Sequence, residues 1–187
     1  MDIPLHSQVR CGETPCGRLL CLIIQPGRRI LTDIVVEREE FHEETRLVPR
    51  RYIDTITSET IQLSCSLDEW KKLEPFIAHE YVMIDLPNWG IDEWSSVYPQ
   101  ERGIDVPREE VPAGELPLHR DAHVSTSDGR VGHLHTVQID PETGRILGLE
   151  AQFGHFWNRE RYSATADEID HIDDDTVFLT VTRHDLS

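Results

Sequence analysis

The stretch Asp128–Leu147, "DGRVGHLHTVQIDPETGRIL", has an altered counterpart earlier in the chain, "CGRLLCLIIQPGRRIL" at Cys16–Leu31. In both stretches an apolar run leads into a turn that contains proline and glycine, and a second apolar run follows. This order is typical of a β-hairpin. The sequence therefore predicts that the chain builds the same small β unit twice.

The similarity extends well beyond the two hairpins. A constant shift of 116 positions aligns Arg28–Leu63 with residues 144–179 without a gap. The identical residues in the first copy are Arg29, Ile30, Leu31, Glu44, Ile53, Asp54, Ile56, Thr60 and Leu63. Upstream the shift becomes 115, which pairs Gly17 with Gly132 and Pro26 with Pro141. The pattern indicates an internal duplication.

The turns of the two hairpins carry different signals. Asp140-Pro-Glu-Thr-Gly144 places proline at the second position of a turn and glycine where a left-handed residue closes the hairpin. Gln25-Pro-Gly-Arg28 shortens this pattern to Pro-Gly, which predicts a type II turn.

Short alternating runs and turn residues fill the rest of each copy, which predicts a small closed β-barrel. Ser66-Leu-Asp-Glu69 has the form of a capping box, so a short helix is expected after the first barrel and should end at Pro75. The expected fold is mainly β, with two small barrels from the duplication. The expected domains are 1–75, a connector at 76–116, and 117–187.

The connector is rich in proline and aromatic residues, unlike a flexible glycine and serine tether. Trp89 and Trp94 lie in it, and Phe156 and Trp157 lie at a polar reversal in the second copy. Exposed aromatic side chains either cover a barrel or contact a partner. These four residues are the candidates for partner binding.

With these motifs, each copy resembles a PRC-barrel domain, which occurs in the H subunit of photosynthetic reaction centres and in the ribosome-maturation factor RimM. The resemblance in the second copy is carried by "GRVGHLHTVQIDPETGRILGLEAQ", "GHFW" and "ATADEIDHIDDDTVFLTV". In the first copy it is carried by "CGRLLCLIIQPGRRILTDIVVE" and "RLVPRRYIDTITSETIQL". The resemblance implies PRC-type barrels and a role as a docking module.

Charge and hydropathy exclude several classes of partner. The chain has 18 Lys+Arg against 35 Asp+Glu, a formal net charge of −17, which repels nucleic acid. No apolar run approaches the ~20 residues that span a bilayer, so a cytoplasmic location is expected. Four cysteines lie in the first half without a matching set in the second, which favours reduced thiols.

A histidine cluster opens the second copy, and His119, His133 and His135 are the candidate metal ligands. A two-residue turn at Asp128-Gly129 predicts that His123 points to the opposite face from His133 and His135, which divides the cluster. Exposed strand histidines are therefore the favoured interpretation. No metal or cofactor is expected.

Other chemistry has little support in the sequence. Cys11, Cys16 and Cys21 have neither zinc-knuckle nor redox spacing, and the carboxylates at 37–44 and 173–175 are expected to be solvated turn charges. No phosphate-binding loop, nucleophile elbow or metalloprotease motif is present, so no enzyme activity is expected. The chain is expected to be a non-catalytic docking or adaptor protein. A small-molecule or metal-binding regulator is the alternative, and a homodimer is left open.

Overall fold

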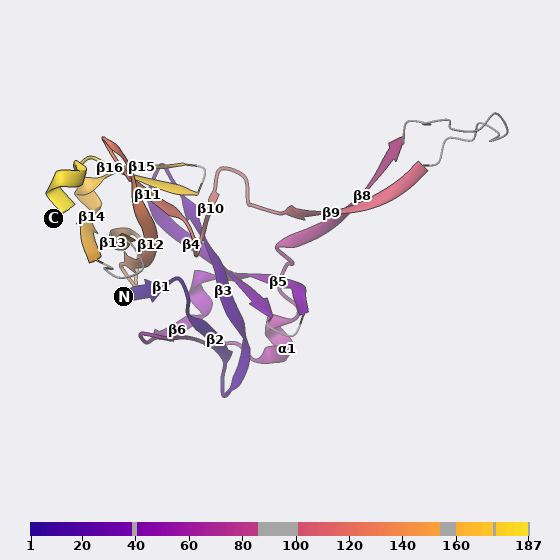
Figure 1. Ribbon diagram of the computed structural model, residues 1–187. Coiled ribbons are helices and arrows are strands. Elements are labelled where there is room, and N and C mark those ends of the chain that lie inside the picture. The colour runs from indigo at the N-terminus through magenta and orange to yellow at the C-terminus, as the bar shows by residue number, and fades with distance from the viewer. Residues whose placement is uncertain (39–40, 86–100, 154–159, 174, 187) are drawn as a thin grey trace, which may run out of the picture.

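The computed structural model describes residues 1–38, 41–85, 101–153, 160–173 and 175–186. Within these residues the protein is mainly β, with two curled half-barrel sheets and a two-stranded arm that projects from them (Figure 1). No helix among the described residues is long and apolar enough to cross a membrane.

The first sheet has the strand order β5-β4-β3-β2-β7-β6. Its strands are β2 (Gln8–Cys11), β3 (Thr14–Gln25), β4 (Ile30–Arg38), β5 (Phe41–Pro49), β6 (Ile53–Ile56) and β7 (Thr60–Leu63). A 3₁₀ turn, η1 (Arg50–Tyr52), connects β5 to β6, and a four-residue helix, α1 (Leu67–Trp70), follows β7.

The second sheet has the corresponding order β14-β13-β12-β11-β16-β15. Its strands are β11 (His123–Thr126), β12 (Gly129–Ile139), β13 (Ile146–Phe153), β14 (Glu160–Thr165), β15 (Ile169–Asp173) and β16 (Thr176–Leu179). The turns η2 (Ala166–Glu168) and η3 (Arg183–Leu186) take the places of η1 and α1.

The two sheets share their irregularities as well as their strand order. A β-bulge between Val9 and Arg10 in β2 corresponds to one between Val124 and Ser125 in β11. Glycine stands at the same point of the long strand in both, where a Cβ on Gly17 would lie 2.1 Å from the Glu37 carbonyl oxygen and one on Gly132 would lie 2.2 Å from that of Gln152. The strands come too close at this point for any larger residue.

Neither sheet closes on itself, in contrast to the expected small barrels. The end strands of each sheet are not paired with one another among the described residues. The concave faces of both halves instead contribute to one hydrophobic cluster, which includes Leu22 and Ile61 from the first half and Leu149 and Val177 from the second. Each half-barrel is thus completed by packing against the other.

A reciprocal exchange of strands joins the halves. Strand β1 (Asp2–Pro4) pairs antiparallel with β12 of the second sheet, and β10 (Leu116–His119) pairs antiparallel with β3 of the first. The expected segments 1–75 and 117–187 therefore each place their leading strand in the other sheet. This exchange was not predicted from the sequence.

The hairpin turns meet between the two halves. Leu31 N donates to Gly144 O at 2.9 Å, and Ile146 N donates to Arg29 O at 2.8 Å. The Arg29 guanidinium donates to Ala166 O at 2.7 Å, and that of Arg50 donates to Pro141 O at 2.7 Å. Backbone and arginine hydrogen bonds thus fix the two sheets to each other.

One turn prediction was correct and the other was wrong. Gly144 has a φ of 74°, as expected for the left-handed residue of its hairpin. The type II turn at Pro26-Gly27 does not form, because the positive φ of this loop, 53°, is at Arg29 rather than at Gly27. A left-handed arginine is unfavourable by itself, but here its carbonyl and its guanidinium both bond to the other half.

The capping box predicted at Ser66 is present. The Ser66 hydroxyl accepts from Glu69 N, and Ser66 N donates to the Glu69 carboxylate. Helical geometry in α1 covers only four residues, and a turn follows. Thr182 and Asp185 make the same kind of bonds at η3, at the corresponding place in the second half.

The expected connector contains regular structure. Strands β8 (Ile77–Asp85) and β9 (Glu101–Glu109) form an antiparallel ribbon with nine residue pairs, from Ile77 with Glu109 to Asp85 with Glu101. We call this ribbon the arm. It extends away from both half-barrels (Figure 1).

Candidate functional site at the base of the arm

The arm is anchored on the outer face of the first sheet. Phe76, which directly precedes β8, is fully buried in a second hydrophobic cluster with Cys21, Ile23 and Val35. These three residues alternate with core residues along β3 and β4, so their side chains leave the sheet on its outer side. The arm therefore covers apolar surface that the half-barrel leaves exposed.

Backbone hydrogen bonds fix the direction in which the arm leaves. Leu47 N donates to Glu74 O at 2.8 Å, and Ile77 N donates to the buried Thr45 hydroxyl at 2.9 Å. On the other strand, Glu110 N donates to Phe76 O at 2.7 Å. Both ends of the arm are thus held where they enter the body.

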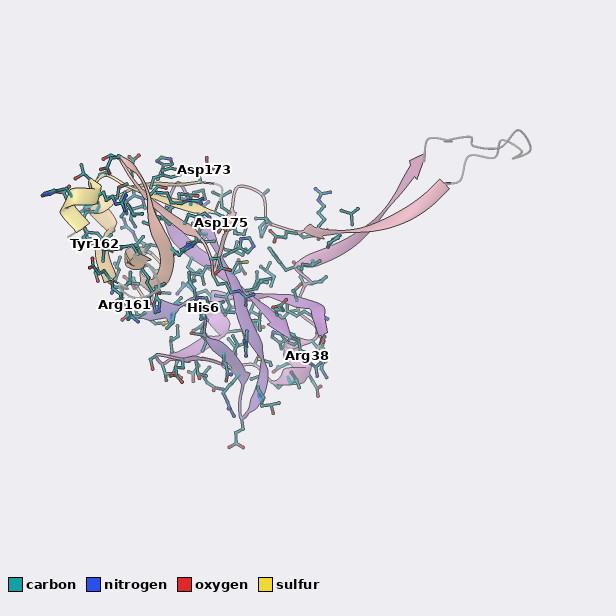
Figure 2. The ribbon with its side chains drawn as sticks, viewed as in Figure 1. His6, Arg38, Arg161, Tyr162, Asp173 and Asp175 are labelled. Carbon is teal, nitrogen blue, oxygen red and sulfur yellow. The ribbon has the colours of Figure 1, made fainter. Side chains whose placement is uncertain are left out.

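A histidine connects the arm base to the second half. His119 in β10 has its Nε2 atom 3.1 Å from Glu109 Oε1, at the end of β9, and its Nδ1 atom 3.4 Å from Asp175 Oδ1. The same Asp175 oxygen accepts from His119 N at 2.7 Å. Asp175, labelled in Figure 2, lies in the turn between β15 and β16 with a φ of 57°.

The surroundings of His119 favour its protonated form. The hydrogen bond to Asp175 raises the pKa of the imidazole above its ordinary value, and the charges of Asp175 and Glu109 act in the same direction. Partial burial opposes this shift. We call His119, Glu109 and Asp175 the junction cluster, because its members come from the arm, the exchanged strand β10 and the second sheet.

The junction cluster links the arm, β10 and the second sheet. Cys21 lies opposite His119 on β3, but burial raises the pKa of its thiol well above the usual range, as do the charges of Glu109 and Asp175. A thiol held in its neutral form is a poor nucleophile.

A cavity of about 440 Å³ lies beside the arm base. Its lining is mixed and includes Glu74, Arg108 and Glu110.

The predicted division of the histidines was wrong. His123 pairs directly with His133, and their ring centroids are 4.9 Å apart. The bulge between Val124 and Ser125 shifts the register, and the turn falls at Ser127-Asp128 rather than at Asp128-Gly129. His123 and His133 therefore share a face.

The three candidate metal ligands nevertheless have separate partners. His119 belongs to the junction cluster, His133 Nδ1 lies 3.2 Å from Asp121 O, and His135 Nδ1 lies 2.9 Å from the Thr136 hydroxyl. Burial lowers the pKa of His135. Among the described residues no group of three histidine, cysteine or carboxylate side chains is placed to hold a metal ion.

The structure groups the cysteines differently from their order in the sequence. The thiol of Cys11 interacts with those of Cys16 and Cys65, whereas Cys21 lies in the cluster under the arm. Burial raises the pKa of Cys65 to about 11. Thr126, Val131 and Val181 stand at the corresponding positions of the second half, so we interpret the three thiols as packing residues.

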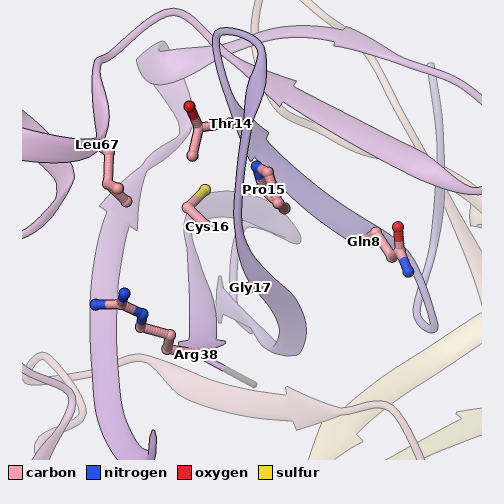
Figure 3. A pocket seen from close by; sticks show the side chains of 7 residues that line it. All are labelled: Gln8, Thr14, Pro15, Cys16, Gly17, Arg38 and Leu67. Carbon is pink, nitrogen blue, oxygen red and sulfur yellow. The ribbon is translucent and has the colours of Figure 1, made fainter. Parts of the chain in front are cut away.

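A second cavity, of about 300 Å³, lies beside Cys16. Cys16, Gly17, Arg38 and Leu67 line it together with residues from the β2–β3 hairpin (Figure 3). The Arg38 guanidinium is paired with the Glu44 carboxylate at 3.1 Å. The cavity lies at the start of β3, whereas His119 of the junction cluster lies opposite Cys21, further along the same strand.

No protein-family model matches this chain, and no curated protein matches it. Sequence reasoning named His119 but missed its partners Glu109 and Asp175, because nothing in the spacing of the three residues brings them together. The candidates Trp89, Trp94, Phe156 and Trp157 lie outside the described residues.

Proposed function

We propose that this chain is a non-catalytic cytoplasmic docking protein, in which two joined half-barrels form a body and the arm engages a protein partner. The observation that carries the proposal is the arm itself, a nine-pair ribbon that projects from the body instead of packing on it (Figure 1). A ribbon of two strands is marginally stable alone. Phe76 and the junction cluster hold the base of the ribbon on the body, which stabilises it as an element that can contact another molecule.

We further propose that the two halves arose by duplication of a PRC-type barrel. The common strand order, the bulges at Val9 and Val124, and the crowded glycines Gly17 and Gly132 support this origin. The docking role implied by the PRC-barrel resemblance agrees with the role proposed for the arm. The neutral, buried thiols Cys21 and Cys65 favour docking over nucleophilic catalysis.

The decisive experiment compares the full chain with a variant that lacks the arm. Residues 79–107 are replaced by Asn-Gly, because Ala78 and Arg108 face each other in the ribbon and a two-residue turn can connect them. This variant keeps Phe76 and Glu109, so the anchor on the body is preserved. Both proteins are used as bait in cross-linking and affinity capture from the native cell extract, with quantitative mass spectrometry.

We expect at least one protein to be captured in near-stoichiometric amount by the full chain and lost with the shortened chain. The control is an unchanged thermal midpoint of the shortened chain, which shows that the body is intact. Equal recovery by both baits would contradict a docking role for the arm.

A further inference from the structure

In the part of the chain that the structure describes, the arm presents two rows of backbone groups with no strand beside them. Among the described residues β8 and β9 form a sheet of their own, and each is paired only with the other. Strand edges of this kind are templates for an added strand. The two edges are not equivalent, however, and their difference shows which one can accept a partner.

The hydrogen bonds at the base determine which residues face outward. Glu110 N donates across the ribbon to Phe76 O, whereas Ile77 N points away from β9 and donates to Thr45. Because the direction alternates along an antiparallel pair, the backbone N–H and C=O groups of residues 79, 81, 83 and 85 point outward from β8. On β9 the outward positions are 101, 103, 105, 107 and 109.

Proline occupies one of the outward positions on β9. Pro107 has no N–H to donate, and proline on an edge strand hinders the approach of another strand. Gly103, also at an outward position of β9, weakens this strand further as a template. Strand β8, in contrast, contains neither proline nor glycine from Ile77 to Asp85. The open edge is therefore that of β8.

Charge indicates the chemistry of the added strand. Strands β8 and β9 carry five carboxylates (Glu80, Asp85, Glu101, Asp105, Glu109) and two arginines, and the cavity at the arm base is lined by Glu74, Glu109 and Glu110 against Arg108. The whole chain has a net charge of −17. A second copy would bring the same charge and be repelled, whereas a basic segment would be attracted.

We propose that the outer edge of β8 is a β-augmentation site for an extended basic segment of a partner protein. The proposal rests on the docking function proposed above and names the edge and the chemistry of the partner. The added strand bonds to the outward backbone groups of residues 79–85. The negative charge of the arm and its base attracts the lysine or arginine side chains of that strand.

The test uses a fluorescent nine-residue peptide of alternating lysine and valine and two proline variants. Met83 and Gly103 face each other across the ribbon, and both N–H groups point outward. Met83→Pro removes an outward donor from β8, whereas Gly103→Pro removes the equivalent donor from β9, and neither changes the charge or the bonds within the ribbon. Binding to the full-length variants is measured by fluorescence anisotropy.

We expect Met83→Pro to weaken binding of the peptide about tenfold or more, because the variant loses one hydrogen bond to the added strand and its proline ring hinders the approach of that strand. Gly103→Pro should leave binding within about twofold of the parent, since its edge is not used. A peptide with glutamate in place of lysine should not bind, and added salt should weaken the lysine peptide.

Three results would overturn the proposal. The first is an equal effect of the two proline variants, and the second is equal binding of the peptide to the chain shortened by Asn-Gly. The third is a dimer of the parent in sedimentation velocity that Met83→Pro dissociates, because the strand added to β8 would then come from a second copy. Loss of a captured partner on arm deletion, combined with any of these results, would leave the docking function standing and reject only the β8 edge.

Discussion

At the scale of single residues, Gly17 and Gly132 show how closely the strands approach in each half. A Cβ on Gly132 would lie 2.2 Å from the Gln152 carbonyl oxygen, which belongs to backbone and cannot rotate away. We therefore predict that Gly132→Ala lowers the free energy of unfolding by about 2 to 4 kcal/mol, through steric strain in a packed sheet. Urea unfolding followed by circular dichroism measures the change.

Gly27→Ala is the matched control for this prediction. Gly27 lies in a turn, where an added Cβ would meet no atom within 4 Å, and its φ is not positive. The substitution should change the free energy of unfolding by less than about 0.5 kcal/mol. Similar losses in both variants would mean that the close approach at Gly132 is not what requires glycine.

The junction cluster makes a prediction about pH at the same scale. The pKa of His119 is raised in the folded protein, first by its hydrogen bond to Asp175. Its contribution to stability is therefore complete below the unfolded value of about 6.5 and is lost as the pH rises through the folded pKa. His119→Gln should accordingly destabilise the protein at pH 6 more than at pH 9, in urea unfolding at both values.

An NMR titration separates this cause from a general effect of the substitution. Asp175→Asn keeps the size of the side chain, and asparagine tolerates the left-handed backbone at this position. It should lower the pKa of the His119 imidazole, whereas Asp173→Asn, at the end of β15, should leave it nearly unchanged. A His119 titration that is identical in the parent and in Asp175→Asn would contradict the role of this carboxylate.

At the scale of elements, the exchanged strand β1 is short but contributes to the core of the other half. Ile3 is fully buried and lies opposite Val137 in β12. We predict that Ile3→Ala lowers the free energy of unfolding by about 2 to 4 kcal/mol. The substitution should reduce amide protection in β12 before it reduces amide protection in β2. Asp2→Ala, an exposed change on the same strand, should have little effect on either strand in hydrogen exchange.

The elements differ in how far the sequence predicts them. The hairpin around Asp140–Gly144 and the capping box at Ser66 follow from local turn and cap chemistry, which acts within a few residues. The bulge between Val124 and Ser125 has no local signal, and missing it placed His123 on the wrong face. The pairing of β1 with β12 depends on residues more than 130 positions apart, which no local pattern encodes.

The candidate site illustrates the same limit. The sequence named Trp89 and Trp94 of the connector as candidates for partner binding but did not predict the ribbon, because Pro107 argues against a strand unless its N–H would face outward. Glu109 and Asp175 meet His119 only after the arm, β10 and the β15–β16 turn have been assembled. Their joint role therefore emerges from the tertiary structure alone.

At the scale of the whole molecule, the shared core and the exchange predict that both halves unfold together. Val177 in β16 and Ile61 in β7 occupy corresponding positions and are both fully buried in the same cluster. Val177→Ala should lower the opening free energy of amides in β7 as much as in β16, because neither sheet persists without the other. Native-state hydrogen exchange measures both. Unchanged protection of β7 would show that the halves open independently.

The exchange of β1 and β10 also determines when each sheet can be completed while the chain is being translated. The N-terminal amine donates to Ile139 O, and β1 finds its partner strand only when β12 has left the ribosome. The first sheet likewise lacks β10 until residue 119 has been synthesised. The first sheet therefore keeps an open strand edge beside β3 until residues 116–119 have been synthesised, and such edges are prone to aggregate. Chaperone binding to stalled chains should accordingly persist until the second half emerges, and should end soon afterwards.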